Sequence, residues 1–110
     1  MKPTLFEKQA ITALLKSEGN SSIDPNALVV LNRQDNVVGS YTTFASTQFE
    51  PTNKSDETIA AYFYNETSDC AIGIMLEMIR EHPVELELFS YEGDPLPVSI
   101  EGFELVRNET

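Results

Sequence analysis

One stretch decides the fold class: Val84-Glu85-Leu86-Glu87-Leu88-Phe89-Ser90-Tyr91. Apolar and acidic side chains alternate over its first five residues, so the three aliphatic side chains fall on one face of an extended strand. A strand with one apolar and one polar face is typical of an antiparallel sheet that packs its apolar side on a core. We therefore expect an antiparallel sheet with Glu85 and Glu87 together on its solvated face.

The chain after this strand predicts a turn and a final strand. Glu92-Gly93-Asp94-Pro95 consists of turn-forming residues. Val98 and Ile100 continue the alternation, which then slips by one residue around Gly102. Because a one-residue slip at a glycine is what a β-bulge produces, we expect a bulged last strand that pairs with the preceding one.

The chain before residues 84–91 predicts a helix. Residues 65–69 offer several helix-capping side chains, and Pro83 would end the helix on the other side. Five apolar residues recur between these limits at helical spacing: Ala71, Ile72, Met75, Met78 and Ile79. This interpretation places Cys70 in the first turn of a helix and His82 in its last turn.

The N-terminal segment predicts another helix. Thr4-Leu5-Phe6-Glu7 fits a capping box, in which a hydroxyl and a carboxylate satisfy the free amide groups of the first turn. Apolar residues then recur with a helical period, and Gly19 is placed to end the helix in the left-handed conformation.

Two strands are expected after this helix. Residues 27–31 form an apolar run, and residues 37–45 are rich in β-branched and aromatic side chains. Residues 33–36 would form the turn between them, which makes a hairpin. Gly39 would mark a bulge or a close approach between two backbones.

Residues 46–57 are polar and are expected to form a mobile loop. Residues 58–64 fit a helix or a strand, and their consecutive aromatic residues favour a strand. Residues 1–110 are therefore expected to form a single α+β domain. Its one antiparallel sheet would have four to five strands and two helices, in the order α-β-β-(β)-α-β-β.

The charge is distributed very unevenly along the chain. The 110 residues include 18 acidic and 7 basic ones, which gives a formal net charge of -11. Residues 1–55 contain five of each kind, so residues 56–110 carry the whole net charge. Such a field repels nucleic acid and anionic membranes and attracts basic partners. Solubility alone is the alternative explanation of this charge.

The sequence predicts a cytoplasmic protein. It has one cysteine, no secretory signal at its N-terminus, and no apolar run long enough to span a bilayer. A reducing compartment is the simplest interpretation of these features.

The sequence contains no motif that predicts an enzyme, a metal site or a cofactor site. His82 is the only histidine, and it is interpreted as a structural residue at a helix end. Cys70 is interpreted as an inert thiol, because Glu66 and Asp69 would raise its pKa. A catalytic interpretation would require His82 to meet Glu92 and Asp94 in one cleft.

The candidate site is a surface for a partner. Glu85 and Glu87 share a strand face, and Glu101 is expected near them across a strand pairing. The simpler explanation of these carboxylates is a solvated strand face that protects a sheet edge from aggregation. Tyr62 and Tyr64 would lie on one side of a strand, where exposed tyrosines can anchor an interface; ordinary packing on the sheet is the simpler explanation.

Two functions are weighed on this basis. The first is a small acidic interaction protein, of the inhibitor, immunity or mimic type, that docks on a basic protein through its C-terminal half. The alternative is a small-ligand-binding module with a preference for a cationic organic ligand. Met75 and Met78 would line its pocket, and a homodimer interface is one place for it.

Overall fold

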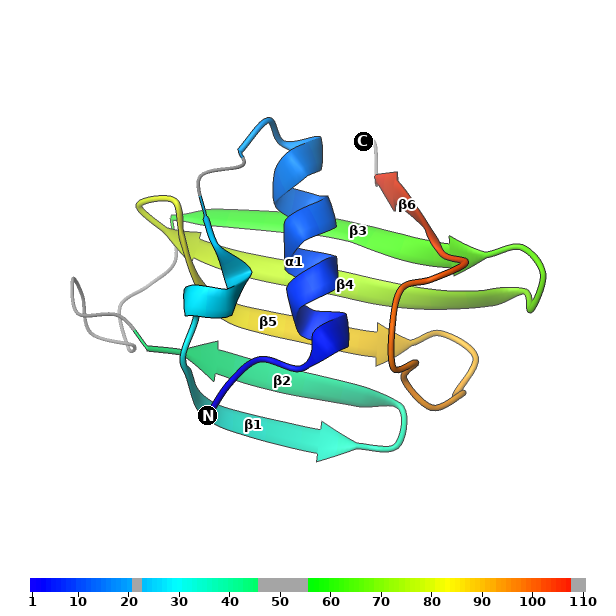
Figure 1. The fold of residues 1–110 in the computed structure, drawn as a ribbon. Coiled ribbons are helices and arrows are strands. Elements are labelled where there is room, and N and C mark those ends of the chain that lie inside the picture. Colours follow the sequence, from blue (N-terminus) through cyan, green and yellow to red (C-terminus); the bar gives the residue numbers. More distant parts are fainter. Residues whose placement is uncertain (21–22, 46–55, 108–110) are drawn as a thin grey trace.

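The structure, a computed structural model, describes residues 1–20, 23–45 and 56–107. The described residues form one α-helix, one short 3-10 helix and six strands (Figure 1). Their bounds are α1 Leu5–Ser17, η1 Pro25–Ala27, β1 Val30–Asn36, β2 Gly39–Phe44, β3 Glu57–Asn65, β4 Cys70–Ile79, β5 His82–Ser90 and β6 Glu104–Arg107. The strands make one sheet in the order β1-β2-β5-β4-β3-β6, and every neighbouring pair is antiparallel.

The helix α1 begins and ends as predicted. The Thr4 side chain accepts a hydrogen bond from the Glu7 amide, and the Glu7 carboxylate accepts one from the Thr4 amide. At the other end, Gly19 has a φ of +77°. The amides of Gly19 and Asn20 donate to the carbonyls of Lys16 and Leu15, which is the Schellman pattern.

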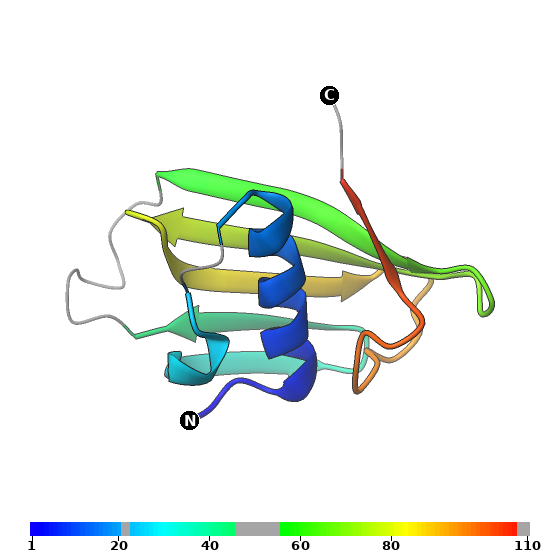
Figure 2. The ribbon, with the colours of Figure 1, turned by 45° about the horizontal axis from the view of Figure 1, so that its top comes forward.

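The core lies between α1 and one face of the sheet. α1 runs across the strands on that face (Figures 1 and 2). Phe6 of α1 meets Phe63 of β3 edge to face, with ring centroids 6.2 Å apart. Other core side chains come from the helix and the four central strands: Ala10, Ile11, Leu14, Phe44, Ile59, Ile72, Ile74, Leu76, Leu86 and Leu88.

The first hairpin is shifted along the chain from its predicted position. Residues 33–36 belong to β1 rather than to a turn, and the turn lies at Val37 and Val38. The Asn36 side chain supports this turn by accepting a hydrogen bond from the Val38 amide. The prediction failed because it took polar residues as a sign of a turn, whereas most of β1 is exposed.

The expected close approach at Gly39 is present. A Cβ atom added to Gly39 would lie 2.8 Å from the backbone oxygen of Leu88 on β5. Because that neighbour is backbone, it cannot rotate away, and this position requires a glycine.

The second helix was a wrong prediction, because residues 70–79 form β4. Residues 58–64 lie in β3, as favoured, and β4 sits between β3 and β5 at the centre of the sheet. A central strand is apolar on parts of both faces, so its sequence resembles a buried helix. Arg80 and Glu81, with φ of 50° and 66°, make the tight turn that joins β4 to β5.

The C-terminal part also differs from its prediction. Residues 91–103 form no strand, and Gly102 occupies a turn with a φ of +85° instead of a bulge. β6 pairs with β3 and not with β5. The expected loop at 46–57 falls largely on residues 46–55, which lie outside the described residues.

The α+β class and the single antiparallel sheet are confirmed, with six strands and one α-helix in place of four to five strands and two helices. Within the described residues, no helix is long and apolar enough to cross a membrane.

Candidate functional site

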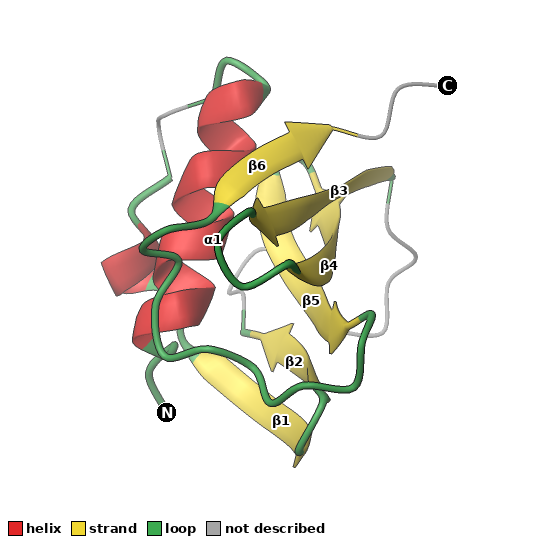
Figure 3. Cartoon of the chain, turned by 90° about the vertical axis from the view of Figure 1, so that its right-hand side faces the viewer, coloured by secondary structure: helices red, strands yellow, loops and turns green. Residues whose placement is uncertain are grey.

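One face of the sheet is covered by α1, and no described element covers the other, which we call the open face (Figure 3). Residues paired across antiparallel strands point to the same face. The register therefore assigns the main side chains of the open face: Tyr41 and Thr43 of β2, Thr58, Tyr62 and Tyr64 of β3, Gly73, Met75 and Glu77 of β4, and Glu85, Glu87 and Phe89 of β5.

Three carboxylates meet on the open face. Glu77 of β4 is paired directly with Glu85 of β5, and Glu87 lies two residues further along β5. All three side chains are half-buried. Among the strand residues that the structure describes, no lysine or arginine lies on this face. Glu77 and Glu85 are thus two like charges in direct register, an arrangement that opposes strand pairing.

Hydroxyl groups hold two of these carboxylates. Thr58 Oγ1 donates to Glu77 Oε2 over 2.8 Å, and Tyr41 Oη donates to Glu85 Oε2. The hydrogen bond to Glu85 raises the pKa of Tyr41 to about 12, with smaller contributions from burial and from the charges of the three glutamates. The phenol of Tyr41 therefore stays protonated and continues to donate at neutral pH.

An aromatic cluster adjoins the carboxylates on the open face. Phe89 pairs with Gly73 and covers it so closely that an added Cβ would lie 2.2 Å from the ring. Tyr91, which is 54% exposed, meets Phe89 edge to face at 5.1 Å and Tyr62 at 6.4 Å. The open face thus combines negative charge with exposed ring surface.

Four of the five predicted partner-binding residues lie together on the open face. Glu85, Glu87, Tyr62 and Tyr64 are there, and Tyr64 Oη donates to Asp69 over 2.8 Å. Glu101 is not, because it lies in a turn and no strand pairing brings it to β5.

The prediction for Glu101 failed because it assumed that the last two strands are neighbours. The amide of the preceding residue, Ile100, donates to Gln9 of α1, which places this turn on the helix side. The edge interpretation of Glu85 and Glu87 is also wrong, because β5 lies inside the sheet.

His82 and Cys70 occupy strand ends rather than helix ends. His82 is the first residue of β5, and its Nδ1 lies 2.7 Å from the Pro83 carbonyl oxygen. Glu92 and Asp94 follow the other end of β5, roughly 27 Å away at the rise of an extended strand. Burial raises the pKa of Cys70, and Asp94, Glu92 and Asp69 raise it further, which keeps this thiol protonated and unreactive.

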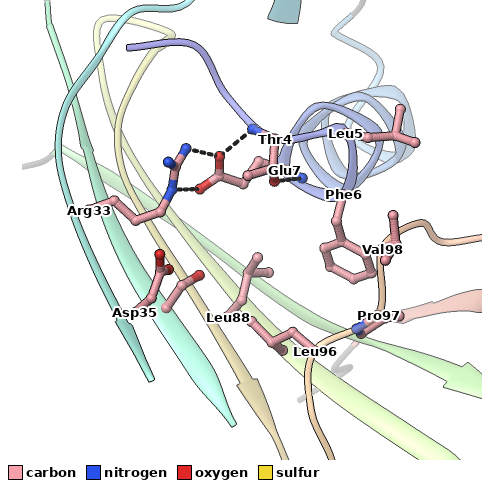
Figure 4. Close-up of a pocket in the computed structure, with 11 residues that line it drawn as sticks. Thr4, Leu5, Phe6, Glu7, Arg33, Asp35, Leu88, Leu96, Pro97 and Val98 are labelled. Carbon is pink, nitrogen blue, oxygen red and sulfur yellow. Dashed lines mark hydrogen bonds and ion pairs between the residues drawn. The ribbon is translucent and has the colours of Figure 1, made fainter. Parts of the chain in front are cut away.

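A second feature lies on the helix side of the sheet. It is a cavity of about 290 Å³, which we call the N-terminal cavity. Its walls come from the start of α1, from β1, β2 and β5, and from the loop after β5 (Figure 4). The lining residues are Thr4, Leu5, Phe6, Glu7, Arg33, Asp35, Ser40, Leu88, Leu96, Pro97 and Val98.

A buried ion pair forms one wall of this cavity. Glu7 is 2% exposed and Arg33 12% exposed. Arg33 Nε and Nη2 donate to the two carboxylate oxygens of Glu7 over 3.1 and 2.5 Å. Glu7 also accepts from the Thr4 amide over 2.7 Å and from Thr42 Oγ1 over 2.6 Å. Burial raises the pKa of Glu7, but the hydrogen bonds outweigh this effect and lower its pKa below the usual value of 4.5.

Sequence reasoning missed this pair, although one signal was available. Glu7 precedes Ala10 and Ile11 by three and four residues, and this spacing puts it on the buried face of α1. Met75 and Met78, in contrast, lie on opposite faces of β4 and do not line one pocket: Met78 is in the core and Met75 on the open face.

Among the described residues, no group of three or more histidine, cysteine or acidic side chains could hold a metal ion. Comparisons with family models, with curated proteins and with solved structures found no match to this chain.

Proposed function

We propose that the protein is a non-enzymatic interaction module that binds a basic protein partner through its open face. The observation that carries this proposal is the set of three carboxylates, Glu77, Glu85 and Glu87, in register on adjacent strands of the open face.

The arrangement favours a cationic occupant on electrostatic grounds. Glu77 and Glu85 oppose each other across a strand pairing, which disfavours the free protein slightly. Lysine or arginine side chains of a partner would remove that repulsion and gain charge-assisted hydrogen bonds to the half-buried carboxylates. The same field accelerates the encounter with a basic surface.

The aromatic cluster supports a protein partner rather than a free cation. Tyr62, Phe89 and Tyr91 present ring surface beside the carboxylates. Aromatic side chains next to charged groups are typical anchors of protein interfaces, because they bury a large area at a small entropic cost. Arginine side chains can also stack on such rings.

Self-association through this face is disfavoured. Two copies that met at their open faces would bring the carboxylates of one copy toward those of the other, and like charges at an interface oppose binding. A nucleic acid is excluded by the same argument, because its phosphates are negative.

The test compares two double charge reversals of equal net charge. Glu85→Lys/Glu87→Lys changes the open face, whereas Glu92→Lys/Glu101→Lys changes two exposed residues of the loop after β5. The probe is a lysine-rich amphipathic peptide that carries a fluorophore, and its binding is followed by fluorescence anisotropy over a series of salt concentrations.

We expect the open-face variant to weaken peptide binding by at least about tenfold more than the matched variant, because two charge-assisted contacts are lost. Wild-type affinity should also fall with salt, because exposed charges are screened. Equal losses in the two variants would show that only net charge matters, and salt-independent binding would likewise refute the proposal.

A further inference from the structure

We propose that the N-terminal cavity binds a small amphipathic monocation, namely an organic ammonium with one compact apolar group. This site is separate from the open face, since it lies on the helix side of the sheet. Binding of this cation does not require the proposed protein partner.

The cavity has a polar end and an apolar end. Figure 4 shows Glu7, Arg33 and Asp35 grouped at one end. Phe6, Leu96 and Val98 lie toward the other. A volume of about 290 Å³ is at the lower limit of small-ligand sites, which suits a ligand with a single ring.

The ion pair occupies most of the donors that could bind an anion, because four of the five N–H groups of Arg33 contact protein atoms. Arg33 donates to both oxygens of Glu7 and to the Lys2 carbonyl, and its Nη1 lies 3.1 Å from the Met1 sulfur. The guanidinium is therefore committed to protein atoms in a two-point contact with a carboxylate. A ligand carboxylate would have to displace Glu7, which the Thr4 amide and Thr42 also hold.

Asp35 supplies the unbalanced charge. Glu7 and Arg33 neutralise each other, so the residues that line the cavity carry one net negative charge, which belongs to Asp35. Asp35 interacts with Arg33 only through charge, and within the described part of the chain no hydrogen bond to its carboxylate is present. Ser40, its cross-strand partner, lines the cavity beside it. A carboxylate with free acceptor sites next to a hydroxyl is suited to receive an ammonium group.

The apolar end supplies the remaining affinity. Leu88 and Phe6 belong to the rigid core, whereas Leu96 and Val98 belong to the loop after β5. A ring placed among these side chains would be partly removed from water, while its ammonium group stayed within reach of Asp35. The cavity thus selects both the charge and the shape of its ligand.

The test uses three probes of similar shape and different charge: benzylammonium, benzyl alcohol and benzoate. Binding is followed by ¹H–¹⁵N chemical-shift titration of the full chain, and intermolecular NOEs locate the ring. We expect benzylammonium to bind most tightly, with NOEs to the methyl groups of Leu88 and Leu96. Benzyl alcohol should bind more weakly, and benzoate should show no saturable binding.

Asp35→Asn should weaken benzylammonium binding about tenfold and leave benzyl alcohol unchanged, because a charge-assisted hydrogen bond is replaced by a neutral one. Asp94→Asn is the matched control, since it removes one exposed carboxylate outside the cavity. Equal effects of the two substitutions, equal affinities for the three probes, or NOEs confined to the open face would each overturn the proposal.

Discussion

Removal of the Glu7 carboxylate should destabilise the fold more than removal of Glu18, the carboxylate of the other described ion pair. Glu7→Ala leaves the guanidinium of Arg33 in a site where its side chain is 12% exposed, and it removes four hydrogen bonds. Breaking a buried ion pair by deleting one partner costs about 3–5 kcal/mol. Because Arg33 keeps some access to water, we expect about 3 kcal/mol, at the lower end of this range.

The chain contains a matched control for this experiment. Glu18 of α1 also pairs with a strand arginine, Arg107, over 2.8 Å, but both side chains are about one-third exposed at 35% and 34%. Glu18→Ala should therefore cost less than about 1 kcal/mol. Glu7→Gln keeps one acceptor oxygen for the Thr4 amide, but it removes the charge and replaces the second oxygen with an NH2 group, so we expect about 1–2 kcal/mol. Urea denaturation followed by circular dichroism measures all three free energies of unfolding.

The pH dependence gives an independent check on the same carboxylate. Burial raises the pKa of Glu7, but the hydrogen bonds from Arg33, Thr42 and the Thr4 amide bring it below 4.5 in the folded protein. A carboxyl whose pKa is lower in the folded state stabilises the fold above its unfolded pKa and loses that contribution as the pH falls through its folded pKa. The difference in unfolding free energy between wild type and Glu7→Gln should therefore be largest at neutral pH and should decrease below about pH 4.5. A difference that stayed constant into acid, or a Glu7→Ala loss no larger than that of Glu18→Ala, would refute the reasoning.

Two further predictions concern the open face. Gly73→Ala should cost about 1–3 kcal/mol, because the added Cβ would lie 2.2 Å from the Phe89 ring; in a Phe89→Ala background the same substitution should be nearly neutral, and a urea double-mutant cycle measures the coupling. Tyr41 should ionise near pH 12 in the wild type and at lower pH in Glu85→Gln, because the hydrogen bond to Glu85 is the largest cause of its raised pKa. Spectrophotometric titration of the phenolate, with Tyr41→Phe to assign the signal, checks this, and an unchanged pKa in Glu85→Gln would contradict it.

The prediction of the sheet succeeded where one strand face is apolar and the other polar. The alternation in β5 placed Glu85 and Glu87 correctly, and the aromatic run in β3 placed Tyr62 and Tyr64 on one side. In such strands a shift of one residue in the register would move every apolar side chain into water. The pattern of apolar residues therefore determines which face each side chain occupies.

The prediction failed in β4 because both faces of this strand contact other side chains. Ile72 and Ile74 face the core, while Gly73 lies under the Phe89 ring. The resulting run of apolar residues fits a helix or a strand by periodicity alone. The β-branched residues and the internal glycine, which disfavours a helix, were the signals that could have decided for a strand. Because β4 was interpreted as a helix, Glu77 was not expected to lie beside Glu85 on a sheet.

The ion pair and the cavity depend on contacts that local patterns do not contain. The capping box identified two of the groups that hold Glu7, but Arg33 and Thr42 lie 26 and 35 residues further along the chain. Their meeting requires both the helix placement and the strand register. Asp35 becomes a candidate ligand group only when the position of the loop after β5 is known.

The distribution of charge in space also differs from its distribution along the chain. Residues 56–110 carry the whole net charge, yet the acidic side chains of residues 56–107 do not form one surface. Glu92, Asp94 and Glu101 belong to the loop that runs from the end of β5 to the α1 side of the sheet (Figure 3). The carboxylates of β4 and β5 lie on the open face because strand pairing holds them in register, and Glu104 of β6, which pairs with Tyr64, lies on the same face. A partner that senses net charge would not distinguish these two groups, whereas a partner that docks on the open face must. For this reason the comparison of charge reversals at equal net charge, rather than the acidity of the whole chain, is the measurement that separates recognition from solubility.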